Sequence, residues 1–451
     1  MSQLLPRFAS IRAFGWLALL LLLATPAYAE VKFQEVTSAK GVTAWLVEDY
    51  SVPLITIRFA FDGGTSQDPV GKEGLANLMT YLFDEGAGDL DSDAFQIRLD
   101  DAGAEQSFAA DADTIYGGMR MLADQRDEAF GLLKLAIQSP RFDQNPIDRM
   151  RAQVVSGIVA AAQSPETAAQ QQWSEALYGT HPYARRSEGT LETVKSLTAD
   201  DLRAMHKALF ARSNLHVGVV GAIDAETLKT VLDNLFGDLP ADPVLVAVPD
   251  VTPNLGQDLH IDYDLPQTSI SLAFPGIKRD APDFFAAYLM NTILGGDGFS
   301  SRLFDEVREK RGLTYGISSS LSNAQHSDLL LIGTQTRADR TSETLGVMRD
   351  VIARMAADGP TDAELASAKQ YVIGSYAISE LGSSTAIAST LVGLQLKDLG
   401  IDYLSRRADL INAVTVTEVK AAAAKLLSAK PAMLILGPPA ADAAAPATPP
   451  S

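Results

Sequence analysis

Two polar side chains at a fixed spacing are the residues of this sequence best suited to bind the backbone of a peptide. Arg308 is followed, with six residues between them, by Tyr315. A guanidinium fork and a tyrosine hydroxyl both donate hydrogen bonds to carbonyl or carboxylate oxygens, so the pair suits recognition of a main chain rather than of particular side chains. Each residue alone has an ordinary alternative: Arg308 as a surface residue of a helix, and Tyr315 as a core residue of a strand.

The segment that carries this pair changes from helix to strand. Apolar residues recur at helical spacing from Leu303 to Val307, and basic residues gather in the expected last turn, where the helix dipole favours cations. Gly312 is suited to end the helix, which we expect to stop near Arg311. Beyond it the apolar residues alternate, which predicts a strand with one face formed by Leu313, Tyr315, Ile317 and Leu321.

At this spacing, and directly after the run at 300–303, the pair resembles the second-half signature of a known family of zinc peptidases. This is the pitrilysin and mitochondrial-processing-peptidase family, the insulinase-like inverzincins, whose inverted zinc motif His-x-x-Glu-His lies in the first half. The resemblance covers nearly all of residues 31–437. It implies that Arg308 and Tyr315 bind substrate by holding a peptide backbone against a zinc site.

The resemblance places the inverted zinc motif at 74–83, where an apolar stripe predicts a helix with one buried face. The motif positions are occupied by Asn77, Thr80 and Tyr81, and the position of the third metal ligand falls at Gly157. Zinc hydrolysis needs imidazole and carboxylate ligands and a carboxylate base, which an amide, a hydroxyl, a phenol and a glycine do not supply. We therefore expect no catalytic residue and no bound metal in this chain.

No other part of the sequence has the spacing of a zinc site. The chain has no cysteine, and no two of its five histidines stand three or four residues apart. Zinc sites in proteins are typically made from such local pairs. The histidines are His181, His206, His216, His260 and His326.

The first 29 residues have the pattern of a secretory signal peptide. Arg7 and Arg12 precede an apolar core, and Ala27 and Ala29 form a small-x-small cleavage site. An uncleaved N-terminal anchor is the alternative. Cleavage would leave a chain more acidic than the −19 of the full sequence, which opposes binding to nucleic acid or anionic membranes. The expected location is the periplasm or outside the cell.

Two similar halves emerge when the sequence is laid over itself with an offset of about 214 residues. Residues 55–61 then match 269–274, and 121–138 match 336–355. Each half begins with strands, followed by a helix, further strands and long helices. This order predicts an α+β fold with two homologous sandwich domains, each a mostly antiparallel sheet packed with helices on one face.

Composition sets the expected domain boundaries. A stretch with four prolines predicts an extended linker, and an alanine- and proline-rich end predicts a disordered tail. The expected segments are a signal peptide at 1–29, an N-terminal peptidase-like domain with a degenerate zinc site at 30–238, the linker at 239–257, a C-terminal peptidase-like domain carrying the Arg/Tyr pair at 258–437, and the tail at 438–451.

A chain with the peptide-binding pair but without the zinc ligands implies a sister chain that has them. The resemblance therefore predicts a non-catalytic, substrate-positioning subunit of a heterodimeric periplasmic zinc metallopeptidase, inactive alone, with zinc bound by the partner. The alternative is a non-proteolytic peptide-binding or structural scaffold protein of the same fold. A third possibility is an autonomous peptidase with unconventional metal ligands.

Overall fold

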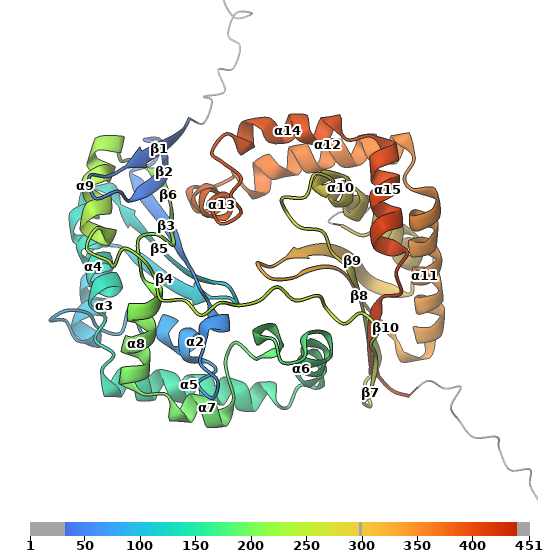
Figure 1. The fold of residues 1–451 in the computed structure, drawn as a ribbon, viewed down its shortest axis with the longest axis horizontal. Coiled ribbons are helices and arrows are strands. Elements are labelled where there is room, and N and C mark those ends of the chain that lie inside the picture. The colour runs from blue at the N-terminus through green and yellow to red at the C-terminus, as the bar shows by residue number, and fades with distance from the viewer. Residues whose placement is uncertain (1–31, 297–299, 440–451) are drawn as a thin grey trace, which may run out of the picture. The chain divides into compact units, whose positions relative to one another are not determined.

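The computed structural model describes residues 32–296 and 300–439 (Figure 1). Gln34 and the described residues after it belong to one compact unit. The predicted signal peptide, and the predicted tail from residue 440 on, lie outside the described residues. Among the described residues, no helix has both the length and the apolar character needed to cross a membrane.

The first half contains a six-stranded sheet in the order β1-β2-β6-β3-β5-β4. Strand β2 is parallel to β6, whereas the β3–β6, β3–β5 and β4–β5 pairs are antiparallel. The strands are β1 (Phe33–Thr37), β2 (Thr43–Glu48), β3 (Leu54–Asp62), β4 (Glu105–Ala110), β5 (Thr114–Leu122) and β6 (Leu215–Gly221).

The second half repeats this topology in a five-stranded sheet in the order β7-β11-β8-β10-β9. Its single parallel pair, β7 with β11, corresponds to β2 with β6, and its other pairs are antiparallel. The shared strand order and directions confirm the predicted α+β fold of two homologous, mostly antiparallel halves. The strands are β7 (Asp258–Asp262), β8 (Gln267–Pro275), β9 (Thr314–Asn323), β10 (Asp328–Arg337) and β11 (Ala432–Gly437).

Apart from α6 and α13, helices of each half bury their apolar residues against one face of their own sheet, which gives each half its own core. Threonine N-caps begin several of them; Thr198, Thr361 and Thr415 each form a reciprocal capping box. The helices of the first half are α2 (Leu75–Thr80), α3 (Ser92–Asp101), α4 (Arg126–Gln138), α5 (Gln144–Ala161), α6 (Pro165–Tyr178), α7 (Leu191–Ser196), α8 (Ala199–Leu209) and α9 (Ala225–Phe236). Those of the second half are α10 (Phe284–Leu294), α11 (Thr341–Asp358), α12 (Asp362–Ser379), α13 (Ser384–Gln395), α14 (Tyr403–Ala413) and α15 (Val416–Leu427).

The opposite face of each sheet is covered by one helix from the other half. Helix α6 packs Trp173 and Leu177 against Leu434 and Leu436 of the second sheet. Helix α13 lies on β6 and β3 of the first sheet, where the Gln395 amide pairs with both the N–H and the C=O of Val217. Because α6 and α13 follow the corresponding helices α5 and α12, the two halves exchange equivalent helices.

The predicted linker at 239–257 contains neither a helix nor a strand. Its backbone instead bonds to elements of both halves: Val244 N–H donates to the Ala208 carbonyl and Val251 N–H to that of His326. These hydrogen bonds attach the segment to both halves. The domain boundaries on either side of it remain predictions.

Candidate functional site

The helix that carries the degenerate zinc motif, α2, is fixed at its start by a buried carboxylate. Gly74 adopts a left-handed conformation with φ of 93° and precedes the helix. The Asp68 carboxylate accepts hydrogen bonds from the Gly74 and Ala76 amides at 2.8 and 2.9 Å. Burial raises the pKa of Asp68 to about 7, and these amides act in the opposite direction.

Three of the four degenerate positions face one cavity of 790 Å³: Asn77 and Tyr81 from α2, and Gly157 from α5. Thr80 does not line it, because its side chain is buried and its hydroxyl donates to the Asn77 carbonyl at 2.7 Å. Over the described residues, the structure contains no group of three or more histidine and acidic side chains placed to hold a metal ion. The cavity therefore has the position expected of a zinc site but not its ligands.

Installing Asn77→His, Tyr81→His and Gly157→Glu together is expected to create a zinc site. Residues 77 and 81 stand one helical turn apart on the cavity wall, and a Cβ added at Gly157 meets no atom within 4 Å. We expect about one retained zinc per chain by elemental analysis, with no peptide hydrolysis, since Thr80 is not a base. The control carries the two histidines alone and should retain less zinc. A triple variant that retains none would contradict this geometry.

The helix that carries Arg308 is π-helical in its last part, η4 (Phe304–Glu309). It has its C-cap at Lys310, close to the predicted end near Arg311, and Gly312 follows with φ of 60°. At the C-terminal end of this helix, the Gly312 amide donates to the Arg308 carbonyl and the Leu313 amide to the Val307 carbonyl. A π-helical turn shifts the following side chains relative to an α-helix and is frequent at functional sites. Sequence periodicity did not reveal this extra residue in the turn.

Arg308 is distinguished from its basic neighbours by its contacts. Lys310 and Arg311 both bond to the Glu306 carboxylate, at 2.8 and 2.6 Å, and hold the pKa of Glu306 at about 2. The Arg308 guanidinium lies 4.6 Å from the centre of the Phe304 ring, with Glu309 at 3.8 Å. Stacking on an aromatic ring leaves the edge of a guanidinium able to donate hydrogen bonds.

Tyr315 does not belong to the core face of its strand, so the predicted alternation is wrong at this residue. A β-bulge inserts one residue in β9: Thr334 pairs with Ile317, but Thr336 pairs with Thr314. The Tyr315 side chain is consequently 87% exposed. The bulge is held by the Thr314 hydroxyl, which donates to the Gln335 carbonyl at 2.6 Å and accepts from the Gly316 amide.

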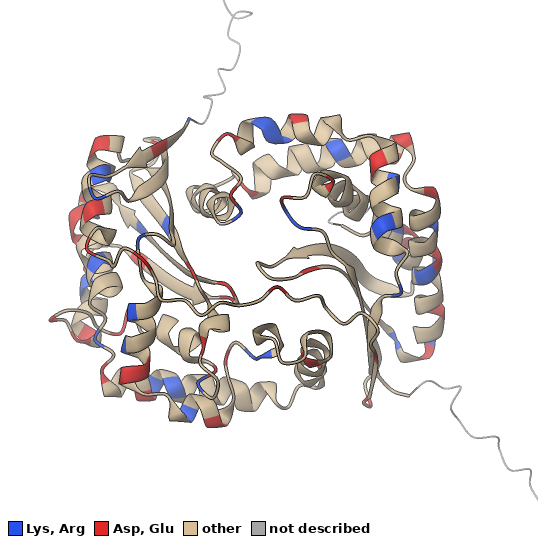
Figure 2. Cartoon of the chain, in the orientation of Figure 1, with Lys and Arg blue, Asp and Glu red and all other residues tan. Residues whose placement is uncertain are grey.

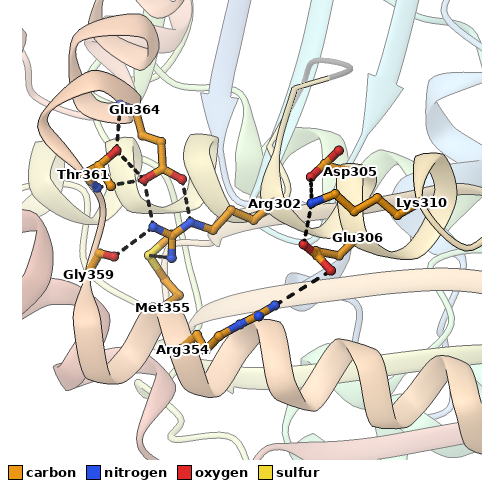
Figure 3. Close-up of polar contacts among 9 residues, drawn as sticks. All are labelled: Arg302, Asp305, Glu306, Lys310, Arg354, Met355, Gly359, Thr361 and Glu364. Atoms are coloured by element: carbon orange, nitrogen blue, oxygen red, sulfur yellow. Dashed lines mark hydrogen bonds and ion pairs between the residues drawn. The ribbon is translucent and has the colours of Figure 1, made fainter.

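The start of the helix that carries Arg308 is anchored by an ion pair (Figure 3). The Arg302 guanidinium binds both carboxylate oxygens of Glu364 at 2.7 and 2.8 Å and also donates to the Gly359 carbonyl. Glu364 in turn accepts from the backbone and hydroxyl of Thr361, the N-cap of α12. One carboxylate thus joins this segment to the start of α12.

Glu364→Gln is expected to lower the free energy of unfolding at pH 7 by about 1–2 kcal/mol, the loss of a bidentate charge-assisted bond that is partly exposed. Arg302 is the main cause that lowers the pKa of Glu364 from 4.5 to about 2. Because the folded-state pKa lies below the unfolded one, this contribution is present above about pH 4.5 and disappears as the pH falls toward 2. The free energies of unfolding of the two proteins, measured in urea from pH 7 to pH 2, should therefore converge as the pH falls.

The matched control for this experiment is Glu343→Gln, which removes an exposed pair with Arg340 on α11. Glu343→Gln should lower the free energy of unfolding at pH 7 by less than Glu364→Gln does, because exposed ion pairs are screened by solvent. Equal costs for the two variants would show that the Arg302 pair does not anchor the segment.

Helix α6 separates the degenerate zinc cavity from a second cavity, of 500 Å³, that Tyr315 and Gly316 line. Glu166 and Gln170 of α6 line both cavities. Tyr315 therefore lines the cavity next to that of the motif positions, across α6, whereas Arg308 lines neither cavity. Glu166 and Gln170 were not singled out from the sequence, because their position depends on the packing of α6 across the two halves.

Comparison with known proteins places the chain among zinc-peptidase relatives. Residues 45–191 match the family model for insulinase (peptidase family M16), and residues 196–372 match the model for the peptidase M16 inactive domain. The fold resembles the crystal structure of a peptidase M16 inactive domain from Pseudomonas fluorescens with a TM-score of 0.84 and 32% identity, covering 91% of this chain and 98% of that one.

Some curated relatives are named as non-peptidases and others as zinc proteases. A non-peptidase homolog of Helicobacter pylori is 25% identical over 345 residues, which cover 76% of this chain and 79% of the relative. An uncharacterized zinc protease of Mycobacterium leprae is 27% identical over 383 residues, which cover 83% of this chain and 85% of the relative. The chain has the two-domain fold of these proteins and is similar to inactive members. It belongs to the peptidase M16, or insulinase, family.

Proposed function

We propose that this chain is the non-catalytic, substrate-positioning subunit of a heterodimeric zinc metallopeptidase in the periplasm. The partner, a homologous chain with the His-x-x-Glu-His motif, supplies the zinc and the catalytic base. This chain contributes the Arg308 and Tyr315 side chains, which orient a peptide substrate and thereby lower the barrier by positioning.

The observation that carries the proposal is the cavity lined by Asn77, Tyr81 and Gly157. It lies where the family resemblance predicts the metal site, but the side chains on its wall at these positions are an amide and a phenol, and the glycine has none. Hydrolysis through a zinc-bound water requires ligands that these groups do not replace. An M16 chain of this kind contributes to proteolysis only through a second chain.

The position of Tyr315 supports a role in binding. A tyrosine kept only for packing is normally buried, whereas the β-bulge in β9 turns this one outward beside a cavity. The acidic and basic residues of the described part of the chain, by contrast, are interspersed along the helices of both halves (Figure 2), whereas proteins that bind nucleic acid gather basic residues on one face. Peptides remain the class of partner that fits the site.

The test is to purify this chain alone and together with an M16 homologue that has the His-x-x-Glu-His motif and is encoded beside it. Bound zinc and cleavage of a quenched fluorescent peptide are then measured for both preparations. We expect the single chain to be free of zinc and inactive, and the pair to co-purify and cleave. Zinc-dependent cleavage by the single chain would overturn the proposal and favour an autonomous enzyme with unconventional ligands.

The second candidate function is a peptide-binding or scaffold protein without proteolysis. It is favoured by the similarity to the non-peptidase homolog of Helicobacter pylori. The same experiment separates the two: a chain that binds peptides or other proteins but forms no active complex with any zinc-binding homologue is a scaffold.

A further inference from the structure

The second half has its own cavity, of 730 Å³, between α10, α12, α13, α14 and β9. It occupies the place that the degenerate zinc cavity has in the first half, because α10 and α12 correspond to α2 and α5. At the offset between the halves Asn291, which lines it, aligns with Asn77. Neither Arg308 nor Tyr315 lines this cavity. It is therefore separate from the site described above.

A buried arginine in this cavity lacks a counter-charge. Arg407 is only 7% exposed; it donates one hydrogen bond to the Val372 carbonyl at 3.0 Å, and its guanidinium lies 4.0 Å from the centre of the Tyr376 ring. Within the described part of the chain it makes no ion pair with an acidic residue. The buried carboxyl group of Asp68, by contrast, accepts hydrogen bonds from two backbone amides. Burying a charge costs free energy unless the charge is paired, so an anion bound beside Arg407 would be stabilised.

A second guanidinium lines the same cavity. That of Arg279 lies 4.1, 5.5 and 5.2 Å from the ring centres of Phe284, Phe285 and Tyr403 and donates to the Tyr403 hydroxyl. It too has no acidic partner among residues 32–296 and 300–439. Stacked guanidinium groups keep their edge N–H groups for planar anions. The rings beside it provide an apolar wall.

The remaining charged groups of the cavity do not neutralise the two arginines. Glu380 accepts a hydrogen bond from the Thr390 hydroxyl at 3.2 Å, and Lys397 donates to the Asn323 carbonyl at 2.9 Å. Burial raises the pKa of Tyr376 to about 12, so its phenol is neutral at pH 7. Arg407 and Arg279 lower that pKa and Glu380 raises it, which locates two cations and one carboxylate near the same ring. The cavity is thus cationic and aromatic within a chain of net charge −19.

We propose that this cavity binds a carboxylate attached to an aromatic or flat apolar group, with the carboxylate paired to Arg407 and Arg279 and the ring packed against the apolar part of the cavity wall. The C-terminal phenylalanine of a peptide and a free aromatic acid share this chemistry. Glu380 favours a monoanion over a phosphate dianion, because a second negative charge would be repelled. The inference depends on this chain alone and not on the proposed partner.

Calorimetric titration of the purified chain with N-acetylphenylalanine, N-acetylphenylalaninamide and phenyl phosphate tests the assignment. We expect the acid to bind and the amide, which lacks the charge, to bind at least about tenfold more weakly, with phenyl phosphate also weaker than the acid. A phenylalanine-terminated tripeptide that binds more tightly than the free acid identifies a peptide end as the source; the reverse order identifies a small aromatic acid. Equal affinity for acid and amide, tighter binding of the phosphate, or no binding at millimolar concentration overturns the assignment.

Variants locate the binding. Arg407→Gln and Arg279→Gln should each weaken binding of the acid at least about tenfold. Ser375→Leu narrows the cavity but keeps both arginines, and it should also weaken binding of the acid. This variant provides the test if Arg407→Gln fails to fold. Arg406→Gln is the matched control, because its side chain on the same helix is 57% exposed and pairs with Asp402. Unchanged binding in Arg279→Gln and Ser375→Leu would place the ligand elsewhere and refute the proposal.

Discussion

Replacing Arg308 with alanine is expected to lower turnover of peptide by the complex of this chain with its zinc-binding partner by about 10- to 100-fold, the equivalent of one or two charge-assisted hydrogen bonds. Tyr315→Phe removes a single neutral donor and should lower turnover by about 3- to 10-fold. Neither change touches a metal ligand, so the zinc content of the complex should not change. The measurements are steady-state cleavage of a quenched fluorescent peptide and elemental analysis of the same samples.

These variants are informative because neither residue supports the fold. Tyr315 is largely exposed, and neither residue belongs to a core cluster; the half-buried Arg308 side chain covers Phe304 and lies beside Glu309. Controls of matched chemistry are Arg406→Ala on α14 and Tyr263→Phe after β7, both exposed and outside the described cavities of the site. If all four variants form the complex and cleave equally well, Arg308 and Tyr315 have no role in positioning the substrate.

Gly218→Val is expected to destabilise the protein by about 3 kcal/mol or more, although valine is the better residue for a strand. Gly218 lies in β6, on the sheet face that α13 covers. A Cβ at this position would stand 2.5 Å from the Ala388 carbonyl oxygen and 3.0 Å from the Leu391 Cβ. Because both obstacles belong to α13 and one is backbone, the helix must move away from the sheet. Urea unfolding monitored by circular dichroism measures the loss.

The matched control is Gly333→Val in β10, a strand in the interior of the second sheet. A Cβ there meets no atom within 4 Å, so this substitution should be neutral or slightly stabilising. If the two valine variants are equally stable, α13 does not pack closely on β6, and the exchange of helices between the halves is looser than described.

Part of the candidate site follows from local sequence. The end of the helix at Gly312 and the strand that follows it were predicted, because a left-handed terminator and alternating apolar residues act over a few positions. The loss of zinc ligands at Asn77, Tyr81 and Gly157 was also predicted, and the structure brings these three positions to one cavity. The assignment of Arg308 and Tyr315 as substrate-binding residues remains a prediction.

The orientation of Tyr315 and the environment of Arg308 could not be predicted in the same way. Tyr315 points outward because β9 gains one residue relative to β10, and that register is set by a strand that follows it in the sequence. Arg308 lies within the π-helical segment η4, and that winding leaves no trace in the spacing of apolar residues. Strand register and helix winding both result from contacts with other elements.

Local spacing was enough to predict the α+β class, because it depends on residue types at short range. The duplicated halves were predicted by comparing the sequence with itself, and the loss of the zinc motif from the resemblance to the family. Tertiary packing decided which helices cover which sheet, how α6 lies between two cavities, and that Arg279 and Arg407 line one cavity. These features join residues more than a hundred positions apart, as Gln395 joins Val217. Their free energy comes from apolar surface and hydrogen bonds shared between distant segments, which no short stretch of sequence contains.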